Sequence, residues 1–128
     1  MRWQAESMHD DQAVLDLVSK YLRSVYEGNT HGLREVFHPN ARVEDVVTGS
    51  FRSRSADQYI EAVGSRQSPL AAGETFTMAP RAIEVLGDMA TVTAELHFLG
   101  NHFYNVLSLL RCEGRWLIMH KLFGSADR

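Results

Sequence analysis

The second half of the chain alternates apolar and polar residues between short turns, and this pattern limits the fold more than any other feature. Across residues 90–99 every second side chain is apolar, which is the period of a strand with one buried face. Gly87-Asp88 precedes this segment and Gly100-Asn101 follows it, and both pairs favour tight turns. Further strands are expected at residues 76–86, 103–111 and 115–123. Short turns between successive strands predict an antiparallel meander.

The first half of the chain has the period of helices. Apolar residues three and four positions apart form one helical face, at Val14, Leu17, Val18, Tyr21, Leu22 and Val25. Ser7 with Asp10 predicts the start of this helix, and Gly28 predicts its end. A short second helix is expected to follow, capped by Asn29 or Thr30.

The segment from Phe37 to Asp45 joins the helical half to the sheet. Pro39 is expected to close the second helix, because proline lacks the N–H that a helix needs. A strand is then expected at residues 41–47, in which Val43 and Asp45 share one face. An acid on an apolar face is either a satisfied structural group or a proton-transfer site.

One more helix completes the first half. A short return strand is expected near Phe51, and Ser55 with Gln58 forms the capping box of a third helix. Helices therefore precede the meander, which predicts an α+β fold. The length of 128 residues fits a single domain, residues 1–128.

Composition narrows the classes of function. The net charge is −3 and no run of Lys or Arg occurs, which argues against a nucleic-acid partner. No apolar stretch approaches the ~20 residues of a membrane span, and no apolar signal segment opens the chain. Cys112 is the only cysteine, so a reducing cytoplasm is the expected location.

With this order of elements, three segments resemble the NTF2-like superfamily. The segments are Tyr21-Leu22-x3-Tyr26-x-Gly28, Leu33-x2-Val36-Phe37-His38-Pro39-x-Ala41 and Gly114-Arg115-Trp116-x-Ile118-x2-Lys121-x-Phe123. The chain looks most like the small bacterial members called SnoaL-like or "putative lumazine-binding" proteins. The resemblance implies a cystatin-like, cone-shaped α+β barrel, in which three helices pack on a curved antiparallel sheet around a deep apolar pocket.

Ketosteroid isomerases belong to the same superfamily, and the resemblance to them implies roles for three polar residues. Tyr21 and Asp45 stand at the spacing of that family's oxyanion tyrosine and general-base aspartate. Asn105 matches the position of its second oxyanion donor. By this resemblance Asp45 would remove a proton beside a carbonyl, and Tyr21 and Asn105 would hold the developing enolate oxygen. No cofactor is expected.

Lys121 departs from that comparison. By alternation it shares a strand face with Met119 and Phe123, and the resemblance implies that this face lines the pocket. Lys121 would anchor a carboxylate or phenolate of the ligand, or it would pair with Asp45. The expected pocket lining also includes Phe37, Leu96, Phe98 and Leu107.

The opposite face of the expected sheet carries an apolar patch. It is formed by Tyr104, Trp116 and Ile118 together with His97 and His120, and Val106 and Leu122 extend it. Exposed patches of this kind mark interfaces, so a homodimer through this face is expected. The six histidines show neither HxH nor HExxH spacing, so no metal site is expected.

Three functions remain open at this point. The first is an isomerase or dehydratase that uses acid–base chemistry beside a carbonyl. The second is a non-catalytic module that holds a small apolar or carbonyl-bearing organic ligand, and the third is a dimerisation module with a filled pocket. Convergence of Tyr21, Asp45 and Asn105 around a void would favour the enzyme. A void with Asp45 paired to Lys121 would favour binding.

Overall fold

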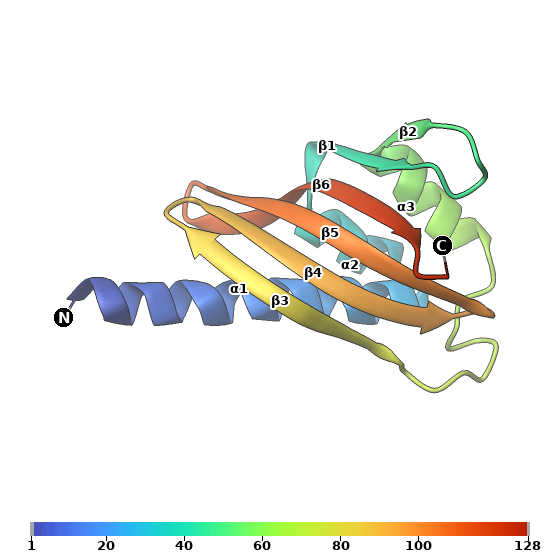
Figure 1. The fold of residues 1–128 in the computed structure, drawn as a ribbon, viewed down its shortest axis with the longest axis horizontal. Helices are drawn as coiled ribbons and strands as arrows, with labels where there is room; N and C mark the ends of the chain where they lie inside the picture. The colour runs from blue at the N-terminus through green and yellow to red at the C-terminus, as the bar shows by residue number, and fades with distance from the viewer. Residues whose placement is uncertain (1, 128) are drawn as a thin grey trace.

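Residues 2–127 form three helices and six strands (Figure 1). The computed structural model describes these residues, with side chains from residue 9 onward. The helices are α1 (Arg2–Glu27), α2 (Thr30–Val36) and α3 (Ala56–Ser65). The strands are β1 (Phe37–Asp45), β2 (Arg52–Ser55), β3 (Met78–Leu86), β4 (Met89–Phe98), β5 (Asn101–Cys112) and β6 (Arg115–Ser125).

The strands form one curved sheet in the order β2-β1-β6-β5-β4-β3. Neighbouring strands are antiparallel except β1 and β6, which run parallel. This pair differs from the antiparallel sheet expected from the sequence, because α3 and four strands form a long crossover between β1 and β6. Helix α1 packs along β3, and α3 covers β1 and β2 (Figure 1). The predicted α+β architecture, helices on a curved sheet, is confirmed.

The helix starts are explained by local chemistry. The Asn29 side chain accepts a hydrogen bond from the Gly32 N–H at the start of α2, at 3.0 Å. Ser55 and Gln58 form the predicted capping box at the start of α3. The predicted start of the first helix near Ser7 is wrong. Helix α1 begins five residues earlier, since residues 2–10 hold neither glycine nor proline to interrupt it.

Pro39 lies inside β1, so the prediction that it closes the second helix is also wrong. Helix α2 ends at Val36, and β1 begins at once with Phe37. Strand β2 pairs only with the later part of β1, from Arg42 onward, and the pairing with β6 is irregular before that residue. Proline is tolerated there because it occupies no regular ladder position that needs its N–H.

A β-bulge in β6 changes which residues face inward. Ile118 pairs with Leu109 of β5 and His120 pairs with the preceding residue of β5, so Met119 is the extra residue. Trp116 and Ile118 are buried before the bulge, and Lys121 is buried after it. The prediction that Trp116 and Ile118 lie on the exposed face is therefore wrong. Met119 also does not share the inward face with Lys121.

The outer face of the sheet keeps a smaller apolar patch than expected. Tyr104, Val106 and Leu122 are exposed there, and His97 and His120 lie on the same face. The homodimer through this face stays a prediction.

The apolar core is one cluster between the sheet and all three helices, and α1 covers one end of it. Val14, Val18 and Leu22 of α1 belong to the same buried cluster as Val92 of β4 and Leu107 of β5. The core therefore fixes one end of the sheet on the long helix. Among the helices of residues 2–127, none is both long and apolar enough to cross a bilayer.

Candidate functional site

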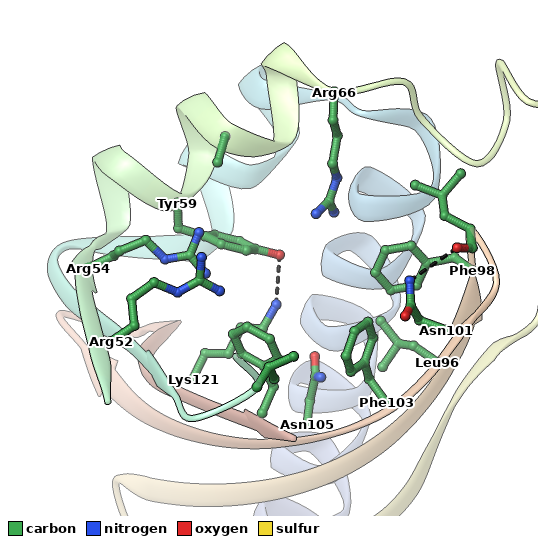
Figure 2. Close-up of a pocket in the computed structure, with 14 residues that line it drawn as sticks. Arg52, Arg54, Tyr59, Arg66, Leu96, Phe98, Asn101, Phe103, Asn105 and Lys121 are labelled. Carbon is green, nitrogen blue, oxygen red and sulfur yellow. Dashed lines mark hydrogen bonds between the residues drawn. The ribbon is translucent and has the colours of Figure 1, made fainter. Parts of the chain in front are cut away.

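A cavity of about 310 Å³ opens between α3 and the concave face of the sheet (Figure 2). Strands β4, β5 and β6 supply one wall, and β2 and α3 supply the other. Its aromatic and amide side chains are Tyr59, Phe98, Phe103, Phe123, Asn101 and Asn105. Its charged side chains are Arg52, Arg54, Arg66 and Lys121, and no acidic side chain of residues 9–127 lines it.

Lys121 and Tyr59 form a buried polar pair at the base of this cavity. The Lys121 Nζ donates to the Tyr59 hydroxyl at 2.7 Å, and both residues are buried (Figure 2). The ammonium also lies 4.1 Å from the centre of the Tyr59 ring and 4.9 Å from that of Phe123. Burial lowers the pKa of Lys121 from its usual value. Burial alone would raise the pKa of Tyr59, but the charge and hydrogen bond of Lys121 lower it below the usual value.

Two arginines of β2 point toward the cavity wall and share one carboxylate. Arg52 Nε donates to Asp45 Oδ2 at 2.9 Å, whereas the nearest Arg54 nitrogen lies 3.8 Å from the same oxygen. Arg54 Nε is buried and has no hydrogen-bond partner among the described residues. Burial and the neighbouring Arg52 lower the pKa of Arg54. Strand β2 therefore supplies more positive charge here than Asp45 neutralises.

Arg66 adds a third guanidinium from the end of α3. It is the residue that caps this helix, and its side chain points into the cavity in Figure 2. The guanidinium lies 5.2 Å from the centre of the Phe98 ring. Arg66 forms no ion pair with any residue whose side chain the structure describes. Its positive charge is therefore available to a molecule in the cavity.

Tyr21 and Asn105 meet, as the resemblance implied. The Tyr21 hydroxyl donates to Asn105 Oδ1 at 2.5 Å, and both residues are buried. Burial raises the pKa of Tyr21 well above its usual value, so the phenol stays protonated. Asn105 lines the cavity but Tyr21 does not. Because its oxygen accepts from Tyr21, Asn105 keeps its NH2 group for a ligand.

The structure places Asp45 apart from this pair. Its carboxylate is fully buried and accepts from the Val47 N–H at 3.0 Å as well as from Arg52. It does not line the cavity, and its partners are arginines rather than Lys121. Asp45 thus closes the turn between β1 and β2 and neutralises part of the arginine charge.

The other predicted pocket residues divide into two groups. Leu96, Phe98, Lys121 and Phe123 line the cavity. Leu107 is buried in the core, and Phe37 packs edge-on against the rings of Tyr21 and Tyr59. Met119 is excluded from the lining by the bulge.

Sequence reasoning missed the arginines and Tyr59. Arg52 and Arg54 are two positions apart on a short strand, so they had to share a face once that strand was recognised. Tyr59 lies in the first turn of α3, directly after the predicted capping box. These two spacings were the features of the sequence from which the positions of Arg52, Arg54 and Tyr59 could have been predicted. Nothing in the sequence indicated that Arg66 would fold back over the cavity.

Comparison with known proteins identifies the family. A family model described as "Putative lumazine-binding" matches residues 9–124. The chain belongs to this family. It is also similar to solved structures that are described as NTF2-like, and no curated protein matches it.

Three of these structures show how far the NTF2-like fold extends along the chain. An NTF2-like protein of unknown function from Silicibacter pomeroyi DSS-3 is 23% identical, covers 91% of this chain and 95% of its own, and gives a TM-score of 0.78. One of unknown function from Shewanella baltica OS155 is 18% identical, covers 91% of this chain and 93% of its own, and gives a TM-score of 0.81. One with a cystatin-like fold from Novosphingobium aromaticivorans is 16% identical, covers 98% of this chain and 88% of its own, and gives a TM-score of 0.69. At these identities the likeness establishes the fold alone.

Proposed function

We propose that this NTF2-like protein binds a small organic anion, with a planar apolar body, in the cavity beneath α3. The observation that carries the proposal is the charge of the lining, which among the described residues holds four cationic side chains and no acidic one. A carboxylate or phenolate is the ligand group that such a lining would recognise.

The cost of leaving these cations without a partner supports an anionic ligand. Lys121 is buried with only a phenol as its hydrogen-bond partner, and Arg54 Nε has no acceptor among the described residues. A buried polar group without a partner costs about 1–3 kcal/mol, and more when it is charged. An anion in the cavity would recover more of this cost than a neutral ligand, because charge-assisted hydrogen bonds are the stronger ones.

The remaining lining defines the body of the ligand. Phe98, Phe103 and Phe123 offer ring faces and edges to a planar group. A volume of about 310 Å³ is at the small end of ligand sites. The family's description names lumazines, which are planar heterocycles of the kind that this aromatic lining would accept.

Arg66 provides the test, because it has no ion pair to lose among the side chains that the structure describes. We expect aromatic carboxylates to raise the melting temperature, and Arg66→Gln to weaken their binding about tenfold, the effect of losing one charged hydrogen bond. Arg42→Gln is the matched control. It removes the same charge from the exposed face of β1, where the Arg42 side chain donates to Ser53. Equal effects of the two substitutions, or equal binding of neutral compounds, would contradict the proposal.

A second candidate function is acid–base chemistry beside a carbonyl, and the Tyr59–Lys121 pair favours it. The pKa values of both groups are lowered, which eases proton transfer between them and a bound substrate. Tyr59 would donate to the carbonyl oxygen and Asn105 would add a second hydrogen bond. Asp45 could act as the base only after release from Arg52. Turnover lost in Tyr59→Phe would support this candidate, and turnover kept in Asp45→Asn would remove Asp45 from it.

A further inference from the structure

Two histidines and a glutamate meet on the outer face of the β4–β5 hairpin. His97 of β4 stands directly opposite His102 of β5, and their rings stack with centres 3.9 Å apart. Glu95 lies two residues before His97 on the same face. Its Oε2 is 2.6 Å from His102 Nε2 and 3.6 Å from His97 Nε2. One carboxylate oxygen thus faces two imidazole nitrogens.

We propose that Glu95, His97 and His102 form a binding site for a divalent transition-metal ion such as Zn²⁺. The three ligand atoms lie within 4.8 Å of one another, so one ion can reach them all after small shifts. Two imidazoles and one carboxylate form a set that zinc and its first-row neighbours accept, whereas Mg²⁺ and Ca²⁺ prefer oxygen ligands alone.

The distances fit a zinc site after a modest adjustment. Ligand atoms about 2.0–2.2 Å from a tetrahedral ion lie roughly 3.3–3.6 Å apart. The separation of 3.6 Å between Glu95 and His97 already matches, while that of 2.6 Å between Glu95 and His102 must lengthen. The stacked rings must also splay, so that both lone pairs point at the ion. The His97 side chain is 47% exposed and can make this movement.

Neighbouring side chains hold the carboxylate ready for a cation. Arg81 Nε donates to Glu95 Oε1 at 2.7 Å, so Oε2 has only its hydrogen bond with His102 to exchange for the metal among the described residues. Hydrogen bonds from Arg81 and His102 lower the pKa of Glu95, so the carboxylate is ionised at neutral pH. The ring of Tyr104 packs beside His102, with centres 5.4 Å apart, and limits the rotation of that imidazole. An open hollow lined by His97 and His102 lies alongside, so water can complete the coordination.

This site is separate from the cavity beneath α3. Leu96 and Phe98 line that cavity, whereas Glu95 and His97 alternate with them and point to the opposite face of β4. Metal binding and anion binding can therefore be tested independently.

The test is a titration of the tag-free, metal-free protein with Zn²⁺, followed by calorimetry, and with Co²⁺, followed by visible absorption. We expect one ion per chain and cobalt bands typical of nitrogen and oxygen ligands. His97→Gln and His102→Gln should each weaken binding more than tenfold, since changes to outer partners of metal ligands already cost about 10–100-fold. His120→Gln is the matched control, because His120 also lies on the outer face and contacts a carboxylate, Glu44, at 2.9 Å.

Two results would overturn the proposal. One is the absence of stoichiometric binding to the wild-type protein. The other is binding that His97→Gln leaves unchanged, or that His120→Gln weakens equally. If His102→Gln does not fold, His97→Gln decides the outcome alone, because its exposed ring contributes little to packing.

Discussion

The concave face of the sheet has a closed end and an open end, although the same three strands build both. Along β5 the inward positions run from Leu109 and Leu107 in the core to Asn105 and Phe103 in the cavity. Strands β4 and β6 make the same transition. At the closed end α1 fills the space with apolar side chains. At the open end α3 stands over cations, phenols and amides instead.

This difference separates residues that stabilise the fold from residues that are available to a ligand. Apolar burial at the closed end supplies the free energy that keeps the open end hollow. The open end buries charge, which stabilises little by itself. Substitutions at the closed end should therefore affect mainly the stability of the fold, and substitutions at the open end should affect mainly ligand binding.

The largest effect on stability is expected at the closed end. Leu107 is fully buried, so Leu107→Ala should lower the free energy of unfolding by about 2–5 kcal/mol. Phe103→Ala should cost less, because Phe103 is only partly buried beside an existing cavity. Urea denaturation of the two variants measures the difference. A larger loss in Phe103→Ala would show that the two ends do not differ in this way.

Asp45→Asn tests whether that residue is structural. The substitution removes the charge that holds Arg52 and weakens the turn between β1 and β2. We expect a loss of about 1–3 kcal/mol in the free energy of unfolding. Anion affinity should stay the same or rise, because a nearby negative charge is lost. A large fall in anion affinity with unchanged stability would mean that Asp45 serves the ligand directly.

Lys121→Met should change anion affinity without lowering the stability of the fold. Anion affinity should fall about tenfold or more, since a buried charged partner is lost. Stability should stay the same or rise, because a buried ammonium is replaced by an apolar side chain of similar length. Parallel denaturation and binding measurements check both. Loss of stability with unchanged binding would reverse the roles that we assign to the two ends.

The pH dependence of anion binding should be the smallest of these effects. The pKa values of Lys121 and Tyr59 are both lowered in the folded protein. A rise in pH removes the positive charge of Lys121 or creates a negative charge on Tyr59. Either change weakens anion binding. Affinity should therefore fall as the pH rises toward the usual pKa of lysine, and the fall should begin below that value. Lys121→Met should give a flatter profile, and an affinity that rises with pH would contradict the assignment.

Sequence reasoning worked where one period or one capping motif decides the structure. The alternation of residues 90–99 gave β4 with bounds close to the observed ones, and the capping box at Ser55 gave the start of α3. It failed where pairing between distant strands decides. Pro39 is tolerated in β1 because β2 and β6 pair regularly with β1 only from Arg42 onward. No local sequence pattern contains that information.

The same division applies to the sites. The contact of Tyr21 with Asn105 followed from a family resemblance, and the inward position of Phe98 followed from alternation. The bulge at Met119 reversed the predicted positions of Trp116 and Ile118, since one extra residue shifts the whole face. His97 and His102 come together only through the register of the hairpin, so the spacing of histidines in the sequence did not reveal them.

The most direct test of the central claim is a calorimetric titration with two matched ligands, an aromatic carboxylate and its carboxamide. They share size and shape and differ in charge. We predict that the carboxylate binds at least about tenfold more tightly, and that Arg66→Gln and Lys121→Met each reduce this preference. Equal affinity for the two ligands, or tighter binding of the carboxamide, would contradict the claim that the open end of the sheet selects anions.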